Sequence, residues 1–375
     1  MTANGARPRA LDVSTGVGAA YAARLLADVG WDVVKVEPAG GDPWRHRESR
    51  WGGGAGGAFT FANAGKRSVT VPTERLVSLA AAADVVIGDF SETGIRDAAL
   101  PETIRSELRP RASVVSVTPF GLTGPRTGWA SSELVVQAAS GLMFLTGEWD
   151  QPPMQLPPYQ GELNGGIAGA TATLAAVRMH HADGEQHDAD VSMVEALAVH
   201  GYGQISSYVY RGEVPRREQR IKAGLRMVPA QDRFVYCAPG AVSSMRMDGI
   251  AELIGEPRLA DQRFQTAEGR MNHYDEFVEL FVPPFQQRTA QEWFEAAEQM
   301  HMTFALVQAL DDLFVCPHLE ARGFLRTVEA PDGTAVQIPG RPFRLEGGPP
   351  EAELGLPRTP GMHTNAVIAE WLNPA

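Results

Sequence analysis

The sequence has few cysteines and an excess of acidic over basic residues. Its 375 residues include only Cys237 and Cys316, and 33 Lys and Arg stand against 45 Asp and Glu, a formal net charge of −12. Two thiols this far apart exclude a disulfide scaffold and match no zinc motif. A net negative chain is poorly suited to a phosphate backbone. We therefore expect no metal site and no nucleic-acid partner.

Long apolar runs are also absent. No stretch approaches the roughly 20 apolar residues that span a bilayer, and the opening segment, MTANGARPRA, lacks the apolar core of a signal peptide. The composition, 44% apolar and 21% charged, is typical of a globular protein with a substantial core. We expect a cytoplasmic protein that does not associate with membranes.

Short apolar strands alternate with helices in the first third of the chain. Strands are expected at 10–14, 31–37, 68–72, 84–90 and 113–121, with helices at 19–30 and 73–83. This alternation predicts an α/β fold with a doubly wound parallel sheet. Small residues recur at helical spacing along 165–181, which predicts a central, buried helix that other helices approach closely.

The second half of the chain has a different organisation. A charged connection, 211–227, precedes a compact α/β unit, 228–316, in which a strand is expected at 233–238 and helices at 245–255, 273–285 and 290–300. The tail, 317–375, is rich in Pro and Gly and ends in a helix near 366–372. Because this tail has so little core of its own, we expect it to lie over other parts of the protein.

A possible dinucleotide motif follows the first strand. The segment GVGAAY, 16–21, opens the first helix, and Glu37 follows about twenty residues later. However, Tyr21 occupies the third glycine position, where its side chain would disturb close packing of the helix on the strand. The motif therefore argues against a dehydrogenase and is compatible with an ADP-like group such as that of coenzyme A.

Several longer segments occur in the order typical of one family. The segment GVGAAYAARLLADVGWDVVKVEPAGGDPWR, 16–45, resembles the opening of the class III CoA-transferases, the CaiB/BaiF family of formyl-CoA and carnitine-CoA transferases. Further segments continue the resemblance over essentially the whole chain: 63–71, 83–90, 113–125, 135–147, 183–197, 261–264, 310–324, 338–345 and 360–364. The α-methylacyl-CoA racemases form a related branch.

The resemblance implies an architecture and a set of partners. It implies a large Rossmann-like CoA-binding domain with a parallel sheet, built from 1–210 and the returning segment 317–375. The connection 211–227 then leads to a smaller inserted α/β domain, 228–316. Two chains are interlocked as a dimer in this family, and a heteromer with a homologous subunit is an alternative. The expected substrates are an acyl-CoA and a small carboxylic acid, without a tightly bound cofactor.

The family's nucleophile is an aspartate, and its position falls on Glu162, within YQGELNGG just before the predicted helix. Any carboxylate can attack a thioester carbonyl and carry a covalent intermediate. The glutamate is one methylene longer, and a displacement of ~1 Å can cost on the order of a hundredfold in rate. Alternatively, Glu162 is only an acidic residue in a first helical turn, favoured by the helix dipole.

The resemblance also implies positions that contact CoA. They comprise the first turn and the end of the fourth strand: Thr15, Gly16, Val17, Gly18, Asp89 and Phe90. Lys66 and Arg96 are the nearest cationic candidates for a phosphate. Asp89 stands where the family usually has Asn, which is unfavourable beside a phosphate. Racemases place a catalytic His where this chain has Ser132 and Glu133, so a racemase ranks below a transferase. A second alternative is a non-catalytic subunit whose partner supplies the aspartate.

Overall fold

The computed structural model describes residues 7–47, 56–90, 108, 112–217, 227–237, 246–330, 333–346 and 355–373. The chain forms two compact units. The first comprises Met1–Gly147, Pro152–Pro215 and His318–Ala375, and the second comprises Glu148–Gln151 and Arg216–Pro317. Within the described residues, no helix is both long and apolar enough to cross a membrane.

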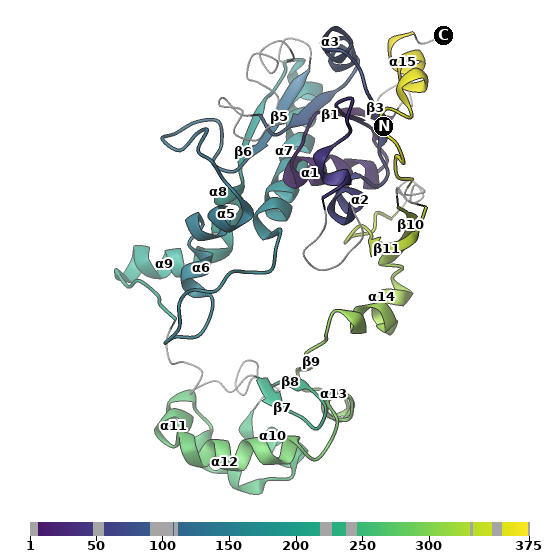
Figure 1. The fold of residues 1–375 in the computed structure, drawn as a ribbon. Helices are drawn as coiled ribbons and strands as arrows, with labels where there is room; N and C mark the ends of the chain where they lie inside the picture. Colours follow the sequence, from purple (N-terminus) through teal and green to yellow (C-terminus); the bar gives the residue numbers. More distant parts are fainter. Residues whose placement is uncertain are drawn as a thin grey trace. The chain divides into compact units, whose positions relative to one another are not determined.

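A six-stranded parallel sheet forms the centre of the first unit (Figure 1). Its order is β3-β2-β1-β4-β5-β6, the order of doubly wound dinucleotide-binding folds. The strands are β1 (Arg9–Asp12), β2 (Asp32–Val36), β3 (Arg67–Val69), β4 (Val85–Gly88), β5 (Ser113–Thr118) and β6 (Ala189–Ser192). The prediction of an α/β fold with a parallel sheet is therefore confirmed.

Helices cover both faces of this sheet. Helices α1 (Val17–Asp28) and α7 (Gln160–Asp183) pack on the face that carries Ala10 and Val33. Helices α3 (Thr73–Ala81) and α15 (Thr364–Leu372) pack on the opposite face. That face carries the residues next in sequence along the strands, such as Leu11. Because both faces are covered, the central strands β4 and β5 are buried along their whole length, rather than alternating between buried and exposed residues.

Shorter helices complete the first unit. Their bounds are α2 (Gly57–Asn63), α5 (Glu133–Ala139), α6 (Leu142–Leu145), α8 (Met193–Ala198), α9 (Tyr202–Arg211) and α14 (Pro317–Ala321), the last beginning at the boundary with the second unit. Single 3-10 turns lie at Pro43–Arg45 and Val199–Gly201. An antiparallel hairpin joins β10 (Leu325–Glu329) to β11 (Ala335–Pro339).

Glycines bring α1 and α7 into close contact. A methyl group added at Gly166 would lie 2.8 Å from the carbonyl oxygen of Gly18 and 2.8 Å from the Tyr21 ring. The predicted small-residue face is thus present, but only this face of α7 is buried. On the opposite face, Ile167 and Leu174 are about half exposed in the single chain, so the helix expected to be central and buried is buried on one face only.

The tail covers the edge of the sheet at β3. The N–H of Ser68 donates to Nδ1 of His363 (3.0 Å), and the N–H of His363 donates to the carbonyl of Ser68 (2.9 Å). Arg45 Nη1 donates to the carbonyl oxygen of Pro357 (2.9 Å), and Trp371 is buried against the α3 face. These contacts satisfy polar groups that an edge strand would otherwise present to solvent.

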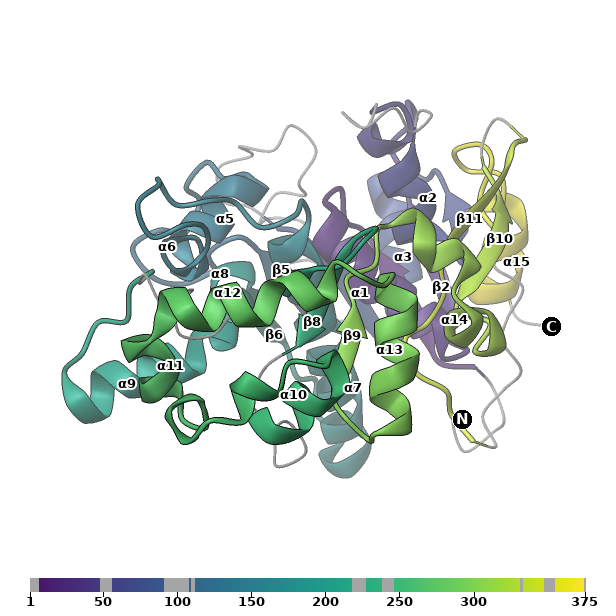
Figure 2. The same cartoon turned by 90° about the horizontal axis from the view of Figure 1, so that it is seen from below.

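The second unit has its own core. Strands β7 (Met227–Pro229), β8 (Phe234–Cys237) and β9 (Phe304–Leu306) form an antiparallel sheet. Figure 2 shows α10, α12 and α13 around β8 and β9. Its helices are α10 (Met247–Ile254), α11 (Ala267–Asn272), α12 (Tyr274–Phe285) and α13 (Ala290–Gln299), with short 3-10 turns at Pro257–Ala260, Gln262–Phe264 and Asp311–Val315.

Aromatic rings fill the core of the second unit. The rings of Phe277 and Phe281 stack at 4.9 Å, and those of Phe285 and Trp293 lie 5.2 Å apart. The Trp293 indole N–H donates to the carbonyl of Phe285 (2.8 Å), so its polar group is satisfied inside the core. Cys237 lies in the same core, and burial raises the pKa of its thiol.

Candidate active site

The turn between β1 and α1 lies at the carboxyl ends of the parallel strands, where doubly wound folds bind ligands. The carboxylate of Asp89, after β4, accepts the Thr15 N–H (2.7 Å) and the Thr15 hydroxyl (3.2 Å). The Trp44 indole N–H donates to the carbonyl oxygen of Thr15 (2.9 Å). Asp89 therefore shapes this turn, which explains how an acidic residue is accommodated there.

The Glu162 side chain reaches the same turn. Glu162 lies in the first turn of α7, is 6% exposed, and its Oε2 accepts the N–H of Gly18 at 2.7 Å. The two residues are 144 positions apart in sequence. The structure thus brings together the expected nucleophile and the expected CoA-binding turn, and α7 begins earlier than the predicted helix.

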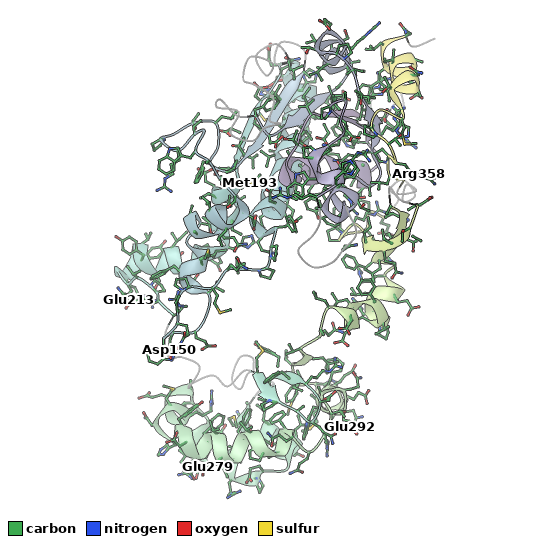
Figure 3. The ribbon with its side chains drawn as sticks, in the orientation of Figure 1. Asp150, Met193, Glu213, Glu279, Glu292 and Arg358 are labelled. Carbon is green, nitrogen blue, oxygen red and sulfur yellow. The ribbon has the colours of Figure 1, made fainter. Side chains whose placement is uncertain are left out.

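Gly18 leaves no room for a side chain. A Cβ at this position would lie 2.8 Å from Cε of Met193, 3.0 Å from the carbonyl oxygen of Glu162 and 3.1 Å from Glu162 Oε2. Met193, labelled in Figure 3, is the first residue of α8 and is fully buried. Because Gly18 has no side chain, its N–H can approach the Glu162 carboxylate directly.

A second carboxylate caps α7. Glu133, at the start of α5, accepts the N–H of Gly161 with Oε1 (2.9 Å) and the N–H of Glu162 with Oε2 (3.2 Å). These are N–H groups without partners inside the helix, and a carboxylate there also complements the helix dipole. The Gln137 amide holds Glu133 Oε1 from the other side (2.8 Å).

Glu133 was not predicted to contact Glu162. In the sequence, Glu133 and Ser132 are notable only because a racemase would place an imidazole group in this region. In the structure the Ser132 hydroxyl caps α5 by accepting the N–H of Val135. No local pattern could have revealed the contact between Glu133 and Glu162, because the partners lie far apart in sequence.

Lys66 lies beneath the turn and points inward. Its ammonium group donates to Asp12 Oδ2 (2.7 Å), to the Ala20 carbonyl (2.7 Å) and to Asn63 Oδ1 (2.8 Å). An ammonium group has three donors, so all of them are used within the protein. Burial lowers the pKa of Lys66 to about 8, although Asp12 acts in the opposite direction.

A second buried lysine supports the turn directly. Lys35 donates to the carbonyl oxygen of Ser14 (2.7 Å) and pairs with Asp42 (3.0 Å). Against the effect of burial, Asp12 and Asp42 raise the pKa of Lys35. Asp12 Oδ1 in turn accepts the Ser14 N–H (2.9 Å). The turn that presents the Gly18 N–H thus rests on a network of buried, paired charges.

The remaining predicted positions differ in their surroundings. Val17 is buried against Ala62, and Gly16 precedes α1 in an extended conformation. Phe90 is 2% exposed and belongs to the core on the α3 face of the sheet. Arg96 lies outside the described residues. Where the chain is described, no group of three or more His, Cys, Asp or Glu side chains could hold a metal ion.

Comparisons with known proteins place this geometry in context. The model of CoA-transferase family III matches residues 8–364. Succinate–glutarate CoA-transferase of Agrobacterium fabrum is 28% identical over 96% of this chain and 94% of its own length. Succinyl-CoA:mesaconate CoA-transferase of Haloarcula marismortui is 29% identical over 90% of this chain and 89% of its own.

Two further similarities concern assembly and fold. Succinyl-CoA:(R)-benzylsuccinate CoA-transferase subunit BbsE of Thauera aromatica is 27% identical over 98% of this chain and 94% of its own. The crystal structure of a CaiB/BaiF family protein from Brucella suis matches with a TM-score of 0.83 at 23% identity, covering 97% of this chain and 98% of that one.

Proposed function

Because this chain belongs to CoA-transferase family III, we propose that it transfers coenzyme A from an acyl-CoA to a small carboxylic acid, with Glu162 as the nucleophile. One observation carries the proposal. The Glu162 carboxylate is buried and is held at 2.7 Å by the N–H of Gly18, in the turn where CoA is expected. The names of the relatives include succinyl-CoA, succinate, glutarate and mesaconate, which point to succinyl-CoA as a donor.

The reaction proceeds through carboxylate-bound intermediates. The Glu162 carboxylate attacks the thioester carbonyl, the C–S bond breaks, and a mixed anhydride forms with release of CoA thiolate. The thiolate then attacks the glutamyl carbonyl and expels the donor acid, leaving a glutamyl-CoA thioester. The acceptor carboxylate attacks that carbonyl and releases the thiolate again. Finally, the thiolate attacks the acceptor carbonyl, forming the new acyl-CoA and restoring the Glu162 carboxylate.

The Gly18 N–H has one role before the reaction and another in the two attacks on the glutamyl carbonyl. In the resting protein its hydrogen bond orients the carboxylate. Once Glu162 is acylated or thioesterified, the same donor lies beside the glutamyl carbonyl oxygen, where negative charge develops during attack. A preorganised backbone donor at such an oxygen stabilises the transition state by roughly 3 to 4 kcal/mol.

The proposal is tested with the chain purified alone. We expect it to exchange CoA between succinyl-CoA and small dicarboxylic acids without a second protein. Hydroxylamine attacks both anhydrides and thioesters, so it should inhibit only when an acyl-CoA is present. Absence of exchange across a panel of acyl-CoAs and acids would overturn a catalytic role for the isolated chain.

A partner subunit is the second candidate. The relative named subunit BbsE and the glutamate at the nucleophile position favour it. In that case this chain contributes fold and interface, and exchange appears only when a homologous chain with an aspartate is added. A racemase is less well supported, because Ser132 and Glu133 cap helices where that chemistry would need an imidazole group.

We also propose that two copies form an interlocked dimer. Large apolar side chains are exposed in the single chain along α9 and the preceding turn, including Val199 (68%), Tyr202 (75%), Val209 (68%) and Tyr210 (86%). Clustered exposed apolar side chains are uncommon on soluble monomers and are typical of an interface, and these residues lie within a dozen positions of one another in sequence.

The dimer makes a prediction about dilution. Interlocked chains separate only by unfolding, so dilution to nanomolar concentration should leave the sedimentation coefficient of folded protein at the dimer value. Unfolding should depend on protein concentration, because two chains must combine to form one native particle. A folded monomer at nanomolar concentration would contradict this proposal.

A further inference from the structure

An aromatic pair lies next to the contact between Glu162 and Gly18. The rings of Trp44 and Tyr159 meet edge to face with centroids 6.2 Å apart. Both pack against Val17 and Ala20 of α1, on either side of Gly18 in sequence. The Trp44 ring is oriented by its N–H, which donates to the carbonyl of Thr15. The pair is therefore positioned by the same turn that positions the nucleophile.

Tyr159 is held in an unusual conformation. It precedes α7, three residues before Glu162, with φ at 68°. A left-handed backbone is uncommon for a residue other than glycine, and such strain concentrates at functional sites. The conformation starts α7 at Gln160, while the Tyr159 ring packs against α1.

A cation lies over the Trp44 ring of this aromatic pair. The Arg47 guanidinium is 4.5 Å from the centroid of the Trp44 ring. Arg47 is exposed, and among the described residues its guanidinium forms no ion pair. Burial raises the pKa of Tyr159; the charge of Arg47 acts against this shift, whereas Glu162 and Glu133 add to it. One cation and two carboxylates thus act on the same phenol.

This arrangement suits an anion that approaches Glu162. A carboxylic acid must approach two carboxylates, Glu162 and Glu133, so its own negative charge is repelled. The Arg47 guanidinium lies over Trp44, whose ring meets that of Tyr159, three residues before Glu162. From there it can offset part of that repulsion, and its planar fork matches a carboxylate. The indole under Arg47 holds the guanidinium in place by a cation–π contact. Less side-chain conformational entropy is therefore lost when Arg47 binds an anion.

We propose that Arg47, supported by Trp44, binds the free carboxylate of a dicarboxylic substrate, the end that does not exchange CoA. The inference rests on the proposed function and specifies its substrate class: acids with two carboxylates, in free and CoA-linked form. Arg47 could instead meet a phosphate of CoA, which carries the same kind of charge. The geometry favours the acid. The Trp44 ring contacts both the Arg47 guanidinium and the Tyr159 ring, and Tyr159 lies three residues before the nucleophile.

The test compares Arg47→Gln with a matched control. Arg9→Gln removes another guanidinium that lies over an indole, 5.2 Å from the Trp371 ring. Arg9 is at the amino end of β1, whereas the site is at the carboxyl ends of the strands. Kinetics are measured with glutarate and with butyrate as acceptors and with succinyl-CoA and butyryl-CoA as donors.

We expect Arg47→Gln to raise the KM for glutarate by about 10- to 100-fold, the usual effect of losing a hydrogen bond to a charged group. The KM for butyrate should be unchanged, so discrimination between the two acids is lost. The KM of Arg47→Lys for glutarate should lie between those of the wild type and Arg47→Gln, because lysine keeps the positive charge but lacks the planar guanidinium. Arg9→Gln should match the wild type with every substrate.

Several results would overturn the inference. One is an equal loss with glutarate and butyrate. Another is a raised KM for both acyl-CoAs with unchanged acid KM, which would assign Arg47 to a CoA phosphate. A wild type that accepts only monocarboxylic acids rejects the inference and leaves the proposed function intact. If the chain shows no exchange at all, the proposed function fails, and the subsite is then tested by calorimetric binding of glutarate. Loss of glutarate binding in Arg47→Gln would support the subsite. An affinity equal to that of the wild type would reject it.

Discussion

Glu162→Gln should reduce CoA exchange by on the order of a thousandfold or more, because an amide is neither anionic nor a competent nucleophile. The fold and the affinity for CoA should persist, since the glutamine oxygen can still accept the Gly18 N–H that Glu162 accepts at 2.7 Å. Exchange rates, calorimetric CoA affinity and the denaturant midpoint check the three expectations. In an active preparation, hydroxylamine should modify a peptide that contains Glu162.

Glu162→Asp is the matched variant for this experiment. It keeps the charge, shortens the side chain by one methylene, and gives the aspartate that the family resemblance implies at this position. Because the shorter side chain draws the carboxylate away from the Gly18 N–H, we expect exchange below the wild-type rate but well above that of Glu162→Gln. An unchanged rate in Glu162→Gln, or the absence of a hydroxamate on this chain while exchange proceeds, would move the chemistry elsewhere and favour the partner-subunit alternative.

Gly166→Ala should impair both stability and catalysis. The added methyl group would lie 2.8 Å from the Gly18 carbonyl oxygen, and a backbone atom cannot swing aside as a side chain can. Forcing α1 and α7 apart should lower the free energy of unfolding by about 1 to 3 kcal/mol. The Glu162–Gly18 hydrogen bond crosses the same contact, so a shift approaching ~1 Å should reduce kcat by about a hundredfold.

Gly40→Ala provides the control for this variant. Gly40 is exposed, and a methyl group there would meet nothing within 4 Å. We expect its unfolding midpoint and its kcat to equal those of the wild type. If Gly166→Ala also behaved like the wild type, the close approach of α1 and α7 would not be what positions Glu162.

The sheet could be predicted because its strands carry a strong local signal. Strands such as Val85–Gly88 and Ser113–Thr118 are short and rich in β-branched residues, and the segments between them favour helices or turns. β6 (Ala189–Ser192) was missed because four residues, one of them charged, show no period. The start of α7 was misplaced because Gly161, Gly165 and Gly166 disfavour a helix locally, whereas packing requires them to be small.

The candidate site was only partly predictable. The position of Glu162 came from a family resemblance, since one acidic residue in a glycine-rich segment has no distinctive pattern. The inward orientation of Lys66 and the contact between Asp89 and Thr15 depend on residues far apart in sequence. Local patterns report helices and strands, but not which charged side chains pair after folding.

The tail contacts have a consequence for synthesis on the ribosome. His363 is hydrogen-bonded to Ser68 across 295 positions, so the edge of the parallel sheet stays open until nearly the whole chain has been made. The second unit lies almost entirely in one continuous stretch, Arg216–Pro317, and domains generally fold as units during translation. The second unit can therefore fold before the tail emerges. During this time the polar backbone groups at the edge of β3 remain exposed. Ribosome pausing before the last fifteen codons should thus lengthen the period in which nascent chains are open to edge-to-edge aggregation.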